Sequence, residues 1–131
     1  MKTTANVFKA LAYAREEATP LLMIGKPGSG ASALARSIGQ LYAPLRAPHY
    51  TAGANLLVQE IALAAGGVLH FDEAHEFSTD ALRVLFCTWQ RMVSNPAQPI
   101  LLLRVHDADG RRRIEGLLDD CSVHTPQCLE L

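Results

Sequence analysis

One stretch of this chain limits its fold more than any other: a glycine-rich segment between a short apolar run and a segment rich in alanine and leucine. The apolar run is Leu-Leu-Met-Ile at residues 21–24, and residues 25–32 follow as Gly-Lys-Pro-Gly-Ser-Gly-Ala-Ser. A short apolar run between proline and glycine is typical of a strand buried in a parallel sheet. Residues 33–42 predict a helix that Pro44 prevents from continuing. The segment therefore joins a strand to the start of a helix, where free backbone N–H groups attract an anion.

The spacing within residues 25–32 is close to that of a phosphate-binding loop. Gly25, Gly30 and Ser32 meet the pattern G-x-x-x-x-G-K-[ST], but Ala31 stands where the lysine belongs. In a complete loop the backbone wraps the phosphates, the lysine neutralises them and the hydroxyl binds Mg²⁺. The candidate phosphate-binding residues are Gly25, Lys26, Pro27, Gly28, Ser29, Gly30, Ala31 and Ser32. The simpler interpretation is a glycine-rich turn that binds nothing.

A second apolar run ends in two acidic residues. Residues 67–73 are Gly-Val-Leu-His-Phe-Asp-Glu, which is the form of a Walker B motif. In that role Asp72 and Ser32 bind Mg²⁺, and Glu73 polarises the attacking water as general base. The alternative is that both acids only solvate the end of a strand. His70 is interpreted as a hydrogen-bonded core residue rather than a ligand. Taken together, the two motifs favour a P-loop nucleotide-binding protein.

Helices and strands are expected to alternate along the rest of the chain. Apolar residues at helical spacing predict helices over residues 4–17, 54–65 and 111–119, and a long helix from its cap Ser78 to Val93. Short apolar runs predict strands over residues 68–71 and 100–105, and a last strand or tail over residues 123–131. Residues 44–51 hold two prolines and are expected to be irregular, with at most a short strand near Tyr50. This alternation predicts an α/β fold of three layers, α/β/α, around a mostly parallel sheet of about five strands.

Composition excludes several classes of protein. The 131 residues suffice for one domain with its own core, and 49% hydrophobic residues are typical of a globular chain. The formal net charge of -1 gives no overall basic field that would attract nucleic acid. The three cysteines lack ligand-like spacing, which favours reduced thiols in a cytoplasmic protein. Neither a signal peptide nor a run of about 20 apolar residues is evident, so we expect no membrane association.

With these motifs the chain resembles the large subdomain of an AAA+ ATPase, most closely the RuvB-type motors of Holliday-junction branch migration. The likeness rests on four stretches: residues 7–10 with 14–18, the loop with residues 21–24, residues 66–78, and residues 100–131. Similar strings occur in magnesium-chelatase-like and clamp-loader-like AAA+ proteins. The resemblance implies an ATP- and Mg²⁺-binding core that forms oligomers and takes part in DNA transactions. The family's helical lid and winged-helix domain would follow Leu131, so residues 1–131 are expected to form a single core domain without either.

The chain departs from this family at several catalytic positions. The loop lysine is Ala31, the sensor-1 position offers only His106 or Asp107, and the arginine-finger position holds Asp120. Because an arginine finger alone contributes about 10³-fold or more in rate, we expect little or no hydrolysis. The leading hypothesis is a degenerate AAA+ module that binds ATP weakly or not at all and associates with itself or with other proteins. The alternatives are a working Mg-ATP-dependent motor subunit and a purely structural interaction module.

Two basic features leave alternatives open. Arg111, Arg112 and Arg113 either form a solvated helix face, which is the commoner case, or touch DNA phosphates or a neighbouring subunit. Lys26 either faces solvent or serves the phosphates, as the signature lysine of a deviant Walker A loop does. With so little basic charge, we expect contact with DNA only indirectly.

Overall fold

Helices and strands alternate along residues 2–124 and 127–131, which the computed structural model describes. In chain order they are α1 Lys2–Glu17, β1 Leu21–Ile24, α2 Ala31–Leu41, β2 Leu45–Arg46, α3 Ala54–Leu63, β3 Val68–Phe71, a 3₁₀ turn Ala74–Glu76, α4 Thr79–Gln90, β4 Ile100–Val105, α5 Ala108–Asp120 and β5 Gln127–Glu130. The predicted last strand or tail is therefore a strand, and its residues 125 and 126 lie outside the described part. No helix among the described residues is long and apolar enough to cross a membrane.

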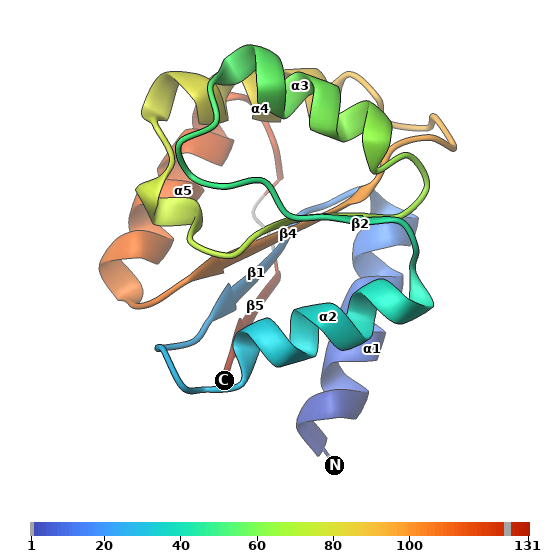
Figure 1. Cartoon of the computed structure of the whole chain (residues 1–131), viewed down its shortest axis with the longest axis vertical. Coiled ribbons are helices and arrows are strands. Elements are labelled where there is room, and N and C mark those ends of the chain that lie inside the picture. Colours follow the sequence, from blue (N-terminus) through green and yellow to red (C-terminus); the bar gives the residue numbers. More distant parts are fainter. Residues whose placement is uncertain (1, 125–126) are drawn as a thin grey trace.

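The strands form one parallel sheet in the order β2-β3-β4-β1-β5. In its register, Met23 of β1 lies beside Arg104 of β4, and His70 of β3 lies beside Leu102 of β4. Helices α3, α4 and α5 cover one face of this sheet, and α1 and α2 cover the other (Figure 1). The predicted three-layer α/β/α fold with about five strands is confirmed.

The apolar core lies on both faces of the sheet. Side chains alternate along each strand, so neighbouring residues of one strand face opposite layers. The larger cluster, under α3, α4 and α5, contains Phe71, Phe77 and Trp89, all at most 2% exposed. The rings of Phe71 and Phe77 meet edge to face, with centroids 4.9 Å apart. The smaller cluster, under α1 and α2, is aliphatic and includes Leu11 and Ile38.

The predicted end of the long helix is wrong. Helix α4 stops at Gln90, and Val93 is 43% exposed rather than packed. The chain turns sharply there, because Ser94 adopts a left-handed backbone conformation with φ 72°. Trp89 donates a hydrogen bond from Nε1 to the carbonyl oxygen of Pro99 at 2.9 Å, which holds the turn against the end of α4.

The predicted start of the last helix is wrong by three residues. Helix α5 begins at Ala108, because the side chain of Asp107 accepts a hydrogen bond from the backbone nitrogen of Gly110 at 2.9 Å. An aspartate in this position satisfies one of the free N–H groups of the first turn. Residues 111–113 therefore lie in the second turn and not at the helix start.

The short strand expected near Tyr50 is also misplaced. The strand at this edge of the sheet is β2, which pairs Leu45 with Val68. The backbone nitrogen of Val68 donates to the carbonyl oxygen of Pro44 at 2.9 Å, so the pairing begins directly after the end of α2. Tyr50 lies in the following loop and is 39% exposed.

The parallel arrangement brings the two sequence motifs together. The loop follows β1, Asp72 and Glu73 follow β3, and His106 follows β4. Because the strands are parallel, all these residues lie at the carboxyl edge of the sheet. In open α/β sheets, ligands bind at this edge.

Candidate phosphate-binding site

The glycine-rich loop has the backbone conformation of an anion cradle. Gly28 and Gly30 have φ of 85° and 87°, a left-handed conformation that side chains disfavour. Gly30 is the N-cap of α2, and within the described part of the chain no side-chain cap hydrogen bond occupies the free N–H groups of that helix start. The loop is tied to the sheet by a hydrogen bond from the backbone nitrogen of Gly25 to the carbonyl oxygen of Val105 at 2.9 Å. Its N–H groups and the helix dipole favour a negatively charged ligand.

The position of the missing lysine holds a small side chain in the wall of a hollow beside the loop. Ala31 is 2% exposed, at the first residue of α2. Lys26, the lysine that the loop does contain, is exposed at its other end. It lines a separate hollow of about 550 Å³ together with Glu130. Its exposure suits the interpretation of Lys26 as a lysine that faces solvent.

Asp72 and Ser32 meet as predicted. The hydroxyl of Ser32 donates to both carboxylate oxygens of Asp72 at 3.2 Å. A third residue, which the sequence analysis did not select, joins them. Arg104 donates from Nη1 to Oδ1 of Asp72 at 3.2 Å and from Nε to the carbonyl oxygen of Gly25 at 3.0 Å. Its side chain is 6% exposed, whereas that of Asp72 is 44% exposed.

The signal for Arg104 is present in the sequence. Strand β4 is Ile-Leu-Leu-Leu-Arg-Val, and all six residues are buried. An arginine inside such a strand requires a partner, because an unpaired buried charge is strongly unfavourable. The strand pattern gives no indication that this partner is Asp72 or that the arginine reaches the loop.

A hollow of about 370 Å³ lies beside the loop. It is bounded by loop and helix residues between Pro27 and Ala33, and by Glu73, Arg104 and His106. Glu73 is 40% exposed, so its carboxylate is accessible to a water molecule. The nearest nitrogen of His106, Nε2, is 3.9 Å from Oε1 of Glu73, beyond hydrogen-bond distance. The predicted general base therefore faces the site, without a tight hydrogen bond to the sensor-1 candidate.

Histidines lie behind these acids. His70 is 4% exposed, and burial lowers its pKa to about 4, which keeps the ring neutral at pH 7. Its Nε2 is 3.7 Å from Oδ1 of Asp72 and has no hydrogen-bond partner among the described residues, so the predicted hydrogen-bonded state is wrong at that atom. The rings of His75 and His106 meet edge to face at 4.5 Å. Burial, and then the neighbouring His106, lower the pKa of His75 below its usual value.

The donor set fits magnesium poorly. A hydroxyl and a carboxylate are oxygen ligands that Mg²⁺ prefers. Here, however, the carboxylate of Asp72 already accepts hydrogen bonds from Ser32 and from the guanidinium of Arg104. A divalent cation at Asp72 would stand next to this buried positive charge. Across residues 2–124 and 127–131, no group of three or more His, Cys, Asp or Glu residues forms a metal site.

The remaining basic and acidic candidates are engaged within the chain. Arg111 binds Glu115 at 2.5 Å, and Arg112 pairs with Asp109. Arg113 donates to the backbone around the 3₁₀ turn and to the hydroxyl of Thr79 at 3.1 Å. Arg112 therefore lies on a solvated face, 72% exposed, as the commoner interpretation expects, whereas Arg113 is bound to the backbone around the 3₁₀ turn.

Asp120, at the predicted arginine-finger position, lies away from the loop of its own chain. It is the last residue of α5 and is 3.4 Å from Nη2 of Arg83. The helix begins beside the loop and runs for 13 residues, or about 20 Å. Any contact of Asp120 with a phosphate would therefore involve a second molecule.

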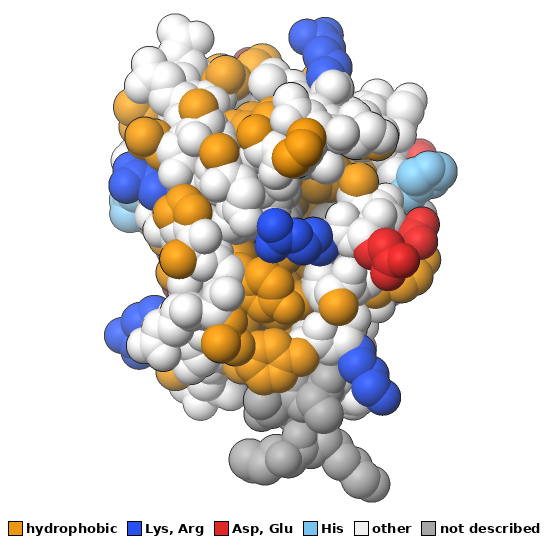
Figure 2. Space-filling view, turned by 90° about the vertical axis from the view of Figure 1, so that its right-hand side faces the viewer, with side chains coloured by type: hydrophobic (Ala, Val, Ile, Leu, Met, Phe, Trp, Pro, Cys, Tyr) orange, Lys and Arg blue, Asp and Glu red, His pale blue; other side chains and the backbone are white. Residues whose placement is uncertain are grey.

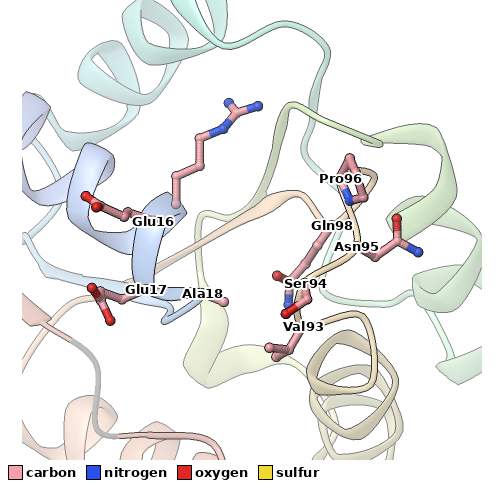
Figure 3. A pocket seen from close by; sticks show the side chains of 9 residues that line it. Glu16, Glu17, Ala18, Val93, Ser94, Asn95, Pro96 and Gln98 are labelled. Atoms are coloured by element: carbon pink, nitrogen blue, oxygen red, sulfur yellow. The ribbon is translucent and has the colours of Figure 1, made fainter.

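A further hollow, of about 400 Å³, lies at the opposite edge of the sheet. Figure 3 shows it between the end of α1, with Glu16 and Glu17, and the turn that contains Asn95 and Gln98. Both segments directly precede strands, so they mark the amino edge of the sheet. Arg15 also lines this hollow, so its wall carries charges of both signs.

Comparisons with solved structures identify the fold. No family model and no curated protein matches the chain. Two variants of RuvB from Thermotoga maritima match at 21% and 20% identity, with TM-scores of 0.68 and 0.67. Both matches cover 99% of this chain and 44% of RuvB, so the chain spans less than half the length of these proteins. The P-loop NTPase domain of a sigma-54 transport activator from E. coli matches at 19% identity and a TM-score of 0.53, over 97% of this chain and 99% of that domain.

At such low identity these neighbours show only the fold. Any activity of the loop has to be argued from the residues of this chain. The chain has the AAA+ P-loop NTPase fold in the form found in RuvB.

Proposed function

We propose that this chain is a degenerate AAA+ module that binds nucleotide weakly at most, hydrolyses little ATP and works by association with other proteins. The observation that carries this proposal is the buried Ala31 at the lysine position, beside an Asp72 already paired with Arg104. The cradle for phosphates is retained, whereas the groups that stabilise the charge of the transition state are altered. In phosphoryl transfer these groups supply most of the catalysis.

Hydrolysis is expected to be negligible for the isolated chain. The loop has no lysine at position 31, His106 is not hydrogen-bonded to Glu73, and Asp120 would repel a neighbour's phosphate. Losing an arginine finger alone costs about 10³-fold or more in rate. Steady-state release of phosphate from ATP, with and without Mg²⁺, measures this directly.

The matched control for the hydrolysis assay is Glu73→Gln, which removes the proposed base and keeps the shape of the side chain. The exposed carboxylate of Glu73 beside the hollow favours the second candidate, a working ATPase whose missing groups come from a partner in a ring. A turnover near 1 s⁻¹, about the low end for enzymes, that vanished in Glu73→Gln would establish that alternative.

Association with a second copy or another protein is supported by exposed apolar side chains. Leu41, Leu56 and Leu63 are 65%, 52% and 54% exposed. Figure 2 shows apolar side chains at the surface of one side of the molecule, with few acidic groups among them. RuvB-like AAA+ proteins oligomerise, and we propose the same for this chain. A sharp monomer in sedimentation at about 100 μM would contradict self-association.

A role in DNA transactions would depend on such partners. The net charge is -1, and each arginine of the cluster Arg111, Arg112 and Arg113 has an acidic or backbone partner within the chain. Direct DNA binding should therefore be weak in physiological salt. Submicromolar affinity that fell steeply as salt rose would contradict this expectation, because it would mean several phosphate contacts.

A further inference from the structure

We propose that Arg104 replaces the missing loop lysine, and that the site binds the diphosphate or triphosphate group of a nucleotide without magnesium. This inference rests on the proposed function, since it concerns the same loop. It assigns the ligand chemistry and the residue that provides the charge.

Arg104 reaches the loop from beneath. Strand β4 lies between β3 and β1, and Arg104 pairs in register with Met23, two residues before the loop begins at Gly25. The bond from Nε to the carbonyl oxygen of Gly25 at 3.0 Å fixes the guanidinium at the base of the cradle. The bond from Nη1 to Asp72 at 3.2 Å fixes its orientation toward β3. A charge carried by the sheet thus lies at the base of the loop and in the wall of the hollow beside it.

The guanidinium retains donors for a ligand. Arginine has five N–H donors, and the two bonds to Gly25 and Asp72 use only two of them. Arg104 also lines the 370 Å³ hollow beside the loop. Guanidinium groups bind phosphate oxygens through two parallel hydrogen bonds and stay charged at all ordinary pH values. A phosphate in the hollow can therefore contact both the loop N–H groups and this buried charge.

The competing explanation is that Arg104 and Asp72 form only a structural ion pair. The burial of the two partners argues against it. The side chain of Arg104 is 6% exposed, so burying its charge costs desolvation free energy. The side chain of Asp72 is 44% exposed, so water would solvate it even without a partner. A pair that served stability alone would gain little from a buried arginine in an apolar strand. A binding site for an anion beside Arg104 would explain why a charged residue is buried in this strand.

The same contact argues for binding without magnesium. In an ordinary loop the metal helps to neutralise the phosphates and is held near the Walker B aspartate. Here the guanidinium already occupies Oδ1 of Asp72. Like charges repel, so a second cation at Asp72 is disfavoured. The phosphate group is therefore expected to bind as the free anion, with Arg104 and the helix start as its counter-charges.

Titration calorimetry of the full chain tests this proposal with ATP, ADP and pyrophosphate, each in EDTA and in excess Mg²⁺. We expect the affinity for ATP and ADP in EDTA to equal or exceed that in Mg²⁺. The pyrophosphate arm separates the two sources of the same chemistry. Equal affinity for pyrophosphate and ADP means that only the phosphates are recognised, and tighter binding of ADP means that the nucleoside contributes.

The variants isolate the charge of Arg104. Arg104→Gln should weaken binding at least about tenfold, and Arg104→Lys should recover most of the loss because it restores a charge. Arg36→Gln is the matched control, because Arg36 is exposed on α2 and its removal changes the net charge equally. Adding Ala31→Lys to Arg104→Gln should restore binding by returning the cation to the loop.

Several results would overturn the proposal. They are unchanged binding in Arg104→Gln, a gain of Mg²⁺-dependent binding in that variant, or at least about tenfold tighter binding of wild type in Mg²⁺ than in EDTA. Absence of binding by wild type at roughly 5 mM ligand would also overturn it. Circular dichroism shows whether Arg104→Gln folds. If it does not, the proposal is tested by comparing the affinities of wild type and of Arg104→Lys in EDTA with those in Mg²⁺.

The proposed function can fail separately. Glu73-dependent turnover of ATP would contradict a degenerate module, whatever Arg104 does. Conversely, unchanged binding in Arg104→Gln together with no ATP turnover would contradict only the ligand chemistry assigned to the loop. The proposal of a degenerate module would stand.

Discussion

The two faces of the central strands carry opposite kinds of side chain near the loop. On the face under α3, α4 and α5, Phe71, Leu103 and Val105 are fully buried hydrocarbon up to the ends of their strands. On the face under α1 and α2, the neighbouring positions hold His70 and Arg104. Successive residues of a strand point to opposite faces, so a shift of one position separates a core residue from a charged one.

This difference separates stability from chemistry. The apolar face buries large side chains without polar groups, which is the main favourable contribution to folding. The other face has an aliphatic core of its own, but near the loop it accepts a buried guanidinium and a neutral imidazole. Such groups add little to stability even when they are paired. The substitutions below test whether the two faces can be altered independently.

The largest effect is expected on the apolar face. Phe71→Ala should lower the free energy of unfolding by about 3–5 kcal/mol, because it leaves a cavity in a fully buried position next to Phe77. Urea denaturation measures the change. Val84→Ala, at a position that is 44% exposed, is the control and should stay within about 0.5 kcal/mol of wild type. A loss below about 1 kcal/mol for Phe71→Ala would mean that this face is not the main core.

A smaller change in stability is expected for the polar positions near the loop, on the face under α1 and α2. Arg104→Met keeps much of the side-chain volume and removes the buried charge, and Asp72, which is 44% exposed, remains solvated. The free energy of unfolding should therefore change by less than about 1.5 kcal/mol, in either direction. The same urea series measures it beside Phe71→Ala. A loss above about 3 kcal/mol would show that Arg104 is needed for folding and that the two faces are not independent.

The sequence predicted the architecture well because each strand is a local apolar run. Residues 21–24, 68–71 and 100–105 are short, continuous and bounded by turn residues, so they required no tertiary information. The ends of α4 and α5 were predicted less well. They depend on the bond from Trp89 to Pro99 and on the cap by Asp107, and both contacts form only when distant or flanking side chains are in place.

The candidate site could be predicted only in part, for a related reason. The loop and Asp72 follow strands in a parallel sheet, so topology alone brings Ser32 and Asp72 together. Arg104 precedes the expected sensor-1 position and was passed over in favour of His106 and Asp107. The sequence shows that Arg104 lies in a buried strand, but it does not show which residue pairs with it. The partner is set by the order of the strands, which places β4 between β3 and β1.

The smallest expected effect concerns the thiols at the border of the apolar face. Cys121 packs against the larger core cluster, and burial, with the nearby Cys87 thiol 3.0 Å away, raises its pKa to about 11. At neutral pH its thiolate fraction should be about a hundredfold lower than in the unfolded chain. Iodoacetamide labelling followed by mass spectrometry should therefore find slow modification of Cys121 at pH 7, with a rate that rises up to about pH 11. The same chain in urea is the reference. Labelling at the rate of the unfolded chain would show that the ends of α4 and α5 open readily, and that the apolar face is less tightly packed at its border than at Phe71.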